Sequence, residues 1–125
     1  MNKNSEFKNY IINDVLGHLD DIGIRSMFGG YGIYWHNIFV AIIAENELYT
    51  KVDKELAKKY KASGYYTFTY QQKDKLAELN YINVPQEILE NPIAIRQRLE
   101  ESYSIAIITI KKPKSGVASR KRRQE

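Results

Sequence analysis

The segment most suggestive of chemistry in this chain is Met27-Phe28-Gly29-Gly30-Tyr31-Gly32. A glycine-rich loop can bind phosphate through its backbone N–H groups, but that use requires a following helix and often a Lys or Ser/Thr at fixed spacing. Here β-branched and aromatic residues follow, and neither the P-loop nor the dinucleotide-binding pattern fits. The segment therefore predicts a turn or bulge in which backbones pass closely, with at least one glycine at positive φ or under a closely packed neighbour.

Other residue types that carry chemistry do not form a recognisable pattern. His18, expected within a helix, and His36, expected in a hairpin turn, have no thiol or second imidazole at ligand spacing, so we predict no metal and no cofactor. The chain has no cysteine and no Gly-x-Ser-x-Gly nucleophile pattern. Adjacent acids such as Glu100-Glu101 are common on solvated surfaces. We therefore expect no catalytic residues and no enzymatic activity.

Tyrosine is unusually frequent, with 10 residues in 125, and Tyr65, Tyr66 and Tyr70 lie close to Phe68 in the sequence. Tyrosine buries a ring while its hydroxyl stays hydrated, so it is favoured at protein interfaces and can stack on exposed bases. It can also fill a small core. The sequence leaves these three uses open and favours the core.

Positive charge is concentrated at the C-terminal end. Residues 111–125 hold seven basic residues and one acidic residue, a net charge of +6, whereas residues 1–110 hold 12 basic and 14 acidic residues, a net charge of −2. The segment has almost no apolar residue and predicts a disordered tail. Its cations could contact nucleic acid without sequence selectivity, or could simply solubilise the chain. The basic residues are Lys111, Lys112, Lys114, Arg120, Lys121, Arg122 and Arg123.

Length and composition indicate one folded domain over residues 1–110. The apolar fraction is 43%, which is ordinary for a globular protein. The longest apolar run, Ile38–Ala44, is too short to cross a bilayer, and the N-terminus lacks the apolar stretch of a signal peptide. We expect a cytoplasmic protein without a membrane partner.

Apolar periodicity predicts an α+β fold of the order α-β-β-β-α-β-β-α, an antiparallel sheet with helices packed against it. The stretch Ile105–Ile110 fits a helix end or a strand. The expected elements are a helix over residues 5–22 ended by Gly23, three strands within 24–52, a helix over Lys54–Ser63, strands over Tyr65–Tyr70 and Leu76–Val84 joined by the loop Gln71–Lys75, and a last helix marked by Pro85 and Asn91-Pro92.

The central strand Ile38–Ala44 is apolar on both of its faces. Strict alternation would place Phe39, Ala41 and Ile43 on one face and Ile38, Val40 and Ile42 on the other. One face should meet helices. A homodimer is expected if the other is left uncovered, because a large exposed apolar patch is unfavourable in a monomer.

From Met27 to Tyr34 the sequence resembles the N-terminal domain of the TfoX/Sxy family of bacterial competence regulators. The similarity continues through Ile38–Ala44, Glu47–Asp53 and the aromatic segment Tyr66–Tyr70. It ends in a Tyr-x-x-Val-Pro step into the last helix, and covers roughly residues 7–107. The motif residues that carry it are Met27, Phe28, Gly29, Gly30, Tyr31, Gly32, Tyr34, Tyr81, Val84 and Pro85.

The resemblance implies the same α+β fold and a regulatory, non-catalytic role linked to DNA uptake and to transcription of competence genes. Longer members carry a second domain of helix-hairpin-helix character, and a basic tail stands in that place here, so we expect a stand-alone version of the domain. The leading hypothesis is an adaptor that binds another macromolecule, in the first place a protein. The alternative is a nucleic-acid-associated protein whose tail makes the contact.

Overall fold

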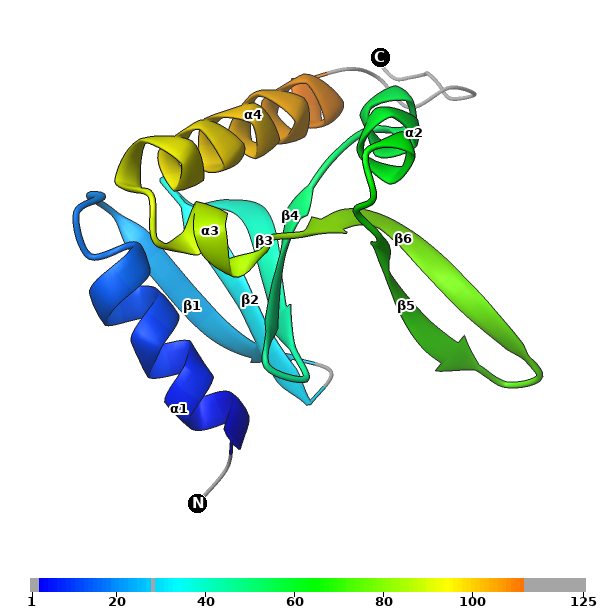
Figure 1. Ribbon diagram of the computed structural model, residues 1–125, viewed down its shortest axis with the longest axis horizontal. Helices are drawn as coiled ribbons and strands as arrows, with labels where there is room; N and C mark the ends of the chain where they lie inside the picture. The colour runs from blue at the N-terminus through cyan, green and yellow to red at the C-terminus, as the bar shows by residue number, and fades with distance from the viewer. Residues whose placement is uncertain (1–2, 28, 112–125) are drawn as a thin grey trace, which may run out of the picture.

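The computed structural model describes residues 3–27 and 29–111 (Figure 1). Phe28 and the basic residues beyond Lys111 lie outside the described residues, as does the predicted disorder of the tail. Lys111 is the last residue of the final helix. In chain order the elements are α1 (Lys3–Tyr10), the π-helical turn η1 (Ile11–Val15), β1 (Ile22–Met27), β2 (Gly30–Trp35), β3 (Ile38–Ala44), β4 (Glu47–Lys51), α2 (Lys54–Ala62), β5 (Thr67–Gln72), β6 (Lys75–Asn83), α3 (Gln86–Leu89) and α4 (Pro92–Lys111).

The strands form a six-stranded antiparallel sheet in the order β1-β2-β3-β4-β6-β5. Tight turns join the first four strands, and Asn37 and Asn46 have positive φ in two of them, as expected for asparagine. Helix α2 then carries the chain past the position of β6, so β6 and not β5 pairs with β4. The α+β class predicted from the sequence is confirmed, but the predicted element order is one strand short. Four strands and not three precede α2, because Ile22–Met27, where apolar and polar residues alternate only weakly, pairs with β2 as a separate strand.

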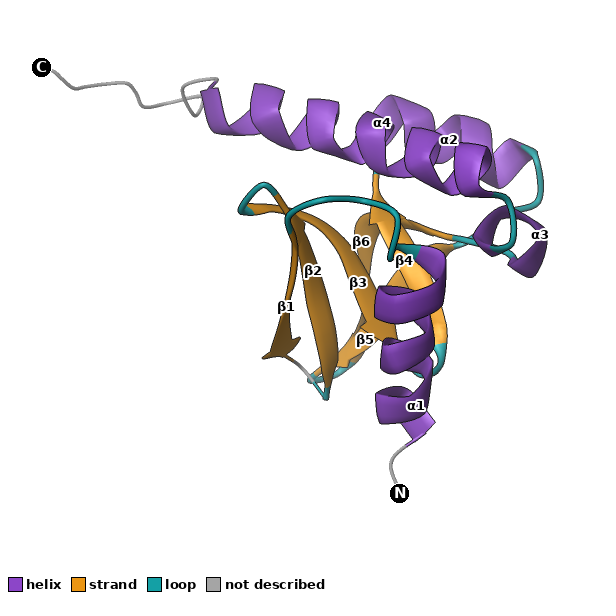
Figure 2. Ribbon diagram, turned by 90° about the vertical axis from the view of Figure 1, so that its left-hand side faces the viewer, coloured by secondary structure: helices purple, strands orange, loops and turns teal. Residues whose placement is uncertain are grey.

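All helices of the described residues lie on one side of the sheet, above and to the right of the strands in Figure 2. The main core lies between that side of the sheet and the segments around η1, α3 and α4. It is built from aliphatic side chains such as Ile11, Ile43, Leu48 and Leu99, all fully buried. A smaller cluster holds α2 against β6 through Ala57 and Ile82. The opposite side of the sheet is covered by no described helix.

The first helix ends earlier than the sequence predicted. The α-helix stops at Tyr10 and continues as a π-helical turn, in which the Leu16 N–H donates to the Ile11 carbonyl at 2.8 Å. His18 consequently lies beyond the helix, and Gly23 lies inside β1 opposite Tyr34 instead of capping a helix. The prediction failed because the later apolar residues of the pattern are held in the core by an irregular segment, which periodicity does not distinguish from a helix.

The remaining elements follow the prediction more closely. Asp53 caps α2 by accepting from the Leu56 N–H at 2.8 Å, and Asn91 Oδ1 accepts from the Ile93 and Ala94 N–H groups at the start of α4. Helix α4 runs through residues 105–110, so the strand alternative there is excluded, and a separate short helix, α3, precedes it. The polar loop predicted over Gln71–Lys75 is wrong in extent, because only Lys73 and Asp74 form the turn between β5 and β6.

A β-bulge corrects the predicted faces of the central strand. Ile33 pairs with Ala41 and Tyr34 pairs with Phe39, so Val40 is an extra residue between two paired positions. The extra residue shifts the alternation, and Val40, Ala41 and Ile43 all belong to the core under the helices. Phe39 instead contacts rings on the opposite side of the sheet.

Candidate binding face on the sheet

The sheet side opposite the helices carries a continuous set of aromatic rings, which we call the aromatic face. Register and ring contacts place its members on β2, β3, β4, β6, β5 and the residue before β5. Ile42, paired with Tyr49 across β3 and β4, lies between the two halves of the set. The aromatic face consists of Tyr34, Phe39, Tyr49, Tyr66, Phe68, Tyr70 and Tyr81.

One half of the aromatic face is packed tightly. The ring centroids of Tyr34 and Phe39 are 5.2 Å apart, and those of Phe39 and Tyr81 are 5.9 Å apart. Tyr81 is only 7% exposed, and burial raises the pKa of its hydroxyl to about 12. The rings of this half are therefore held in place by their contacts with one another.

The other half is open to solvent. Tyr49 makes edge contacts with Phe68 at 5.3 Å and with Tyr66 at 6.4 Å, and Phe68 stacks on Tyr70 at 6.2 Å. Tyr66 and Tyr70 remain 46% and 39% exposed. The hydroxyls of Tyr49 and Tyr66 both donate to the Glu47 carboxylate, and burial together with that contact raises the pKa of Tyr49. Rings held in place yet exposed are suited to contact a partner.

Two cations lie over rings of the packed half. The Arg25 guanidinium is 5.2 Å from the centre of the Tyr34 ring, and the Lys51 ammonium is 5.3 Å from the centre of the Tyr81 ring. Burial lowers the pKa of Lys51. The aromatic face thus combines rings with positive charge at one side and the Glu47 carboxylate at the other.

The glycine motif shapes the aromatic face. A strand, β2, and not a helix follows Gly29, so the motif lacks the helix N-terminus that a phosphate-binding loop requires. A Cβ built at Gly30 would lie 2.1 Å from the Ile43 carbonyl oxygen, and one at Gly32 would lie 2.6 Å from Met27 Cε and 2.8 Å from a Phe39 ring carbon. Gly29 has a φ of +74°. The predicted turn with close backbone approach is confirmed. Gly32 leaves the space into which the Met27 and Phe39 side chains fold.

The other motif residues divide between the two sides of the sheet. Tyr34 and Tyr81 lie on the aromatic face, whereas Tyr31 packs against the core under the helices, with the Lys8 ammonium 5.5 Å from its ring centre. Val84 is buried in the core, and its N–H donates to the Leu48 carbonyl at 2.9 Å. Pro85 is the residue before α3. Two motif residues, Tyr34 and Tyr81, therefore belong to the candidate site, and the other motif residues have a structural role.

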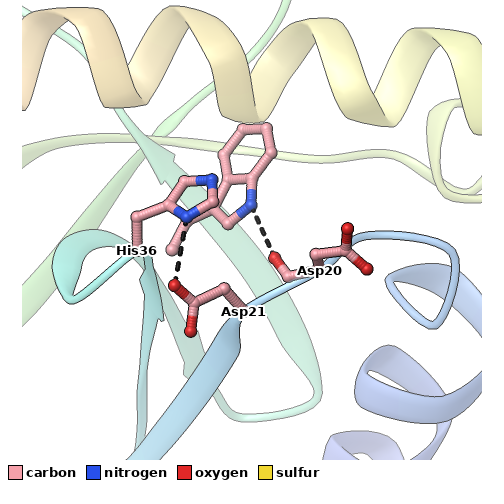
Figure 3. Close-up of polar contacts among 4 residues, drawn as sticks. Asp20, Asp21 and His36 are labelled. Atoms are coloured by element: carbon pink, nitrogen blue, oxygen red, sulfur yellow. Dashed lines mark hydrogen bonds and ion pairs between the residues drawn. The ribbon is translucent and has the colours of Figure 1, made fainter.

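A polar cluster separate from the aromatic face links the start of β1 to the β2–β3 turn (Figure 3). The Trp35 indole N–H donates to the Asp20 carbonyl at 2.9 Å, and His36 Nδ1 lies 3.1 Å from an Asp21 carboxylate oxygen. The His36 ring stacks on Trp35. The His36 and Asp21 side chains are half exposed or more, so their contact contributes little to stability. The cluster ties the start of β1 to the neighbouring hairpin.

Among residues 3–27 and 29–111, no three His, Cys, Asp or Glu side chains come together in a way that could hold a metal ion. Within the same ranges, no helix has the length and apolar character required to cross a membrane.

Sequence reasoning missed several members of the site. The sequence marks Tyr34 and Tyr81 as motif residues and groups Tyr65, Tyr66 and Tyr70 with Phe68, but it does not connect Phe39, Tyr49, Arg25 and Lys51 with them. Tyr65 does not belong to the aromatic face, because its ring packs on the helix side against the cluster of α2 and β6. The alternation of Tyr49 and Lys51 along β4 was a usable signal for one sheet face. Phe39 carried no such signal, because the bulge at Val40 decides which way it faces.

Comparison with known proteins identifies the family. The TfoX N-terminal domain family matches residues 14–106, most of the folded part of the chain. The DNA transformation protein TfoX1 of Aliivibrio fischeri (strain ATCC 700601 / ES114) is 24% identical over 78 residues, which are 62% of this chain and 37% of that protein. The chain thus spans a little over a third of that relative's length. On this evidence, the chain belongs to the TfoX N-terminal domain family.

Proposed function

We propose that the domain is a non-catalytic adaptor in DNA transformation that regulates competence by binding a protein partner through its aromatic face. The observation that carries the proposal is that seven rings share one side of the sheet, while every described helix packs on the other side. The name of the similar protein supplies the association with DNA transformation.

The character of the aromatic face favours a protein partner. Tyr66 and Tyr70 present ring surface with a polar hydroxyl, the combination enriched at protein interfaces. Glu47 holds two of the hydroxyls in place, so the rings lose little freedom when a partner docks. The same carboxylate would repel the phosphates of a nucleic acid.

Substitution of the exposed rings tests the proposal in the native host. Tyr66→Ser with Tyr70→Ser removes the two most exposed rings of the aromatic face. Ile93→Ser with Ile108→Ser is the matched control, because these two side chains are 71% and 56% exposed on α4 and belong to neither core cluster. We expect the tyrosine variant to lose transformation and cross-linking to its partner at least tenfold, and the control to keep both. Equal behaviour of the two folded variants would contradict the proposal.

A second candidate, binding of single-stranded nucleic acid, is favoured by Arg25 and Lys51 beside the rings and by the basic C-terminal sequence. The test is a salt titration of binding to single-stranded and duplex DNA. It compares the wild-type chain with a variant in which the six basic residues from Lys112 to Arg123 become Gln. In this candidate the variant binds more weakly and with a smaller salt slope. Equal, undetectable binding of both proteins would leave the protein-binding adaptor.

A further inference from the structure

Arg98 of α4 is a buried cation that forms no ion pair among the described residues, although the nearby Glu101 carboxylate favours its charge. Its side chain is only 5% exposed. Its Nε–H donates to Thr50 Oγ1 at 3.2 Å, and its Nη2 donates to the carbonyls of Ile82 at 3.2 Å and Asn83 at 2.7 Å. The Nη1 atom is buried and has no hydrogen-bond partner. A buried charged nitrogen without an acceptor is costly, so this atom calls for an explanation.

The guanidinium lies beside a pocket between α2 and the α3–α4 segment. The guanidinium carbon is 4.7 Å from the Tyr60 ring centre and 5.6 Å from that of Tyr65, so two rings cover it. The pocket has a volume of about 310 Å³, at the small end for ligand sites. Besides Arg98, it is lined by Tyr60, Tyr65, Ile88, Ala94, Gln97 and Glu101.

We propose that this pocket binds a small carboxylate whose oxygens accept from Arg98 Nη1. Guanidinium N–H groups match the planar geometry of a carboxylate. Ile88 and Ala94 offer apolar surface to the hydrocarbon part of such a molecule, and the Gln97 amide offers a further donor. Glu101 disfavours a doubly charged phosphate, because its carboxylate also lines the pocket.

The contacts of Glu101 explain why Arg98 does not already form an ion pair with an acid of this protein. Glu101, the acid of the pocket, accepts a hydrogen bond from the Tyr60 hydroxyl at 2.9 Å and makes no ion pair with Arg98. Tyr65 lies between α2 and β5, outside both elements. Its ring packs against the Tyr60 ring, with centroids 5.2 Å apart, and against the smaller core cluster, so a ligand that reaches Nη1 must displace this ring. The pocket lies on the helix side of the sheet, so the proposal is independent of the aromatic face.

Titration with butyrate at constant ionic strength tests the proposal, followed by the NMR signal of the Arg98 Nε–H group and by the backbone amides of residues 97–101. Inorganic phosphate and chloride are the comparison anions. We expect a saturable change with butyrate, at least fivefold weaker binding of phosphate, and none of chloride. Tighter binding of phosphate would overturn the assignment to a carboxylate, and a change that never saturates would overturn the site.

Three variants complete the test. Arg98→Met removes the guanidinium and should abolish the saturable change. Since it also removes three hydrogen bonds and can unfold the chain, Ala94→Phe provides a second route by filling the pocket and leaving Arg98 in place. Ile93→Phe, one position away and outside the pocket lining, is the control. We expect at least tenfold weaker butyrate binding in Ala94→Phe and wild-type binding in Ile93→Phe. Equal binding in these two variants would overturn the proposal.

Discussion

The two sides of the sheet differ in residue type and in exposure to solvent. The helix side is aliphatic, and side chains such as Ile33, Ile43 and Leu48 have no exposed surface. The aromatic face is built mainly of tyrosines, whose exposure rises from 7% at Tyr81 to 46% at Tyr66. Aliphatic side chains gain stability only by leaving water, each contributing about 1.5–3 kcal/mol when fully buried. Tyrosine rings can pack on one another and still keep a hydrated hydroxyl.

This difference shows how one thin sheet can be stable and still offer a binding surface. The main core of fully buried aliphatic side chains lies on the helix side, so we expect that side to contribute more to the free energy of folding than the partly exposed aromatic face. Its rings are ordered by contacts with one another and by hydrogen bonds to Glu47. Substitutions on the two sides should therefore affect stability to different degrees.

The largest effect is expected from Leu99→Ala on the helix side. Leu99 is fully buried in the main core, so its truncation should lower the free energy of unfolding by about 2–5 kcal/mol. Chemical denaturation measures the change. If Leu99→Ala lowered the free energy of unfolding by less than Tyr66→Ala does, the proposed difference between the two sides would be wrong.

Gly30→Val should cost about 1–3 kcal/mol, because its Cβ would meet the Ile43 carbonyl oxygen across the sheet. Gly23→Val is the matched control, since the nearest atom to a Cβ there is Tyr34 Cβ at 3.9 Å. The control should melt at or above the wild-type temperature, as valine favours strands. Unchanged melting of Gly30→Val would show that the backbone approach is not constraining.

The pH dependence of stability should reveal the packed half of the aromatic face. Because the pKa of Tyr81 is raised from 10.0 to about 12, the folded and unfolded chains both keep its proton below pH 10. Between pH 10 and 12 the unfolded chain loses that proton first, so stability falls as pH rises. Tyr81→Phe should lessen the fall by roughly 1.4 kcal/mol per pH unit. Parallel pH profiles for the variant and the wild type would contradict this account.

The smallest effect on stability is expected at the open half. Tyr70→Glu changes a side chain that is 39% exposed, and should alter the free energy of unfolding by less than about 1 kcal/mol.

The same variant tests whether a second copy of the chain covers the aromatic face. Sedimentation equilibrium should then show a wild-type dimer that Tyr70→Glu dissociates. A wild-type monomer at micromolar concentration would leave the face to a different partner.

Local sequence signals determined most of the elements of this protein. Asp53, Asn91 and Pro92 mark helix starts because capping and proline geometry depend on a few neighbouring residues. The turns at His36-Asn37 and Glu45-Asn46 follow from the tolerance of asparagine for positive φ. The family pattern from Met27 to Tyr34 was also legible in the sequence, and the family match bears it out.

Only the tertiary structure decided which side chains meet. The bulge at Val40 turned Phe39 toward Tyr81, and the pairing of β6 with β4 brought Tyr81 and Lys51 side by side, because each depends on contacts between residues far apart in the chain. The same holds for Arg98, whose hydrogen-bond partners lie on β4 and β6. Residue types predict that tyrosines can form a surface or a core. The packing of every described helix on one side of the sheet is what leaves them at a surface.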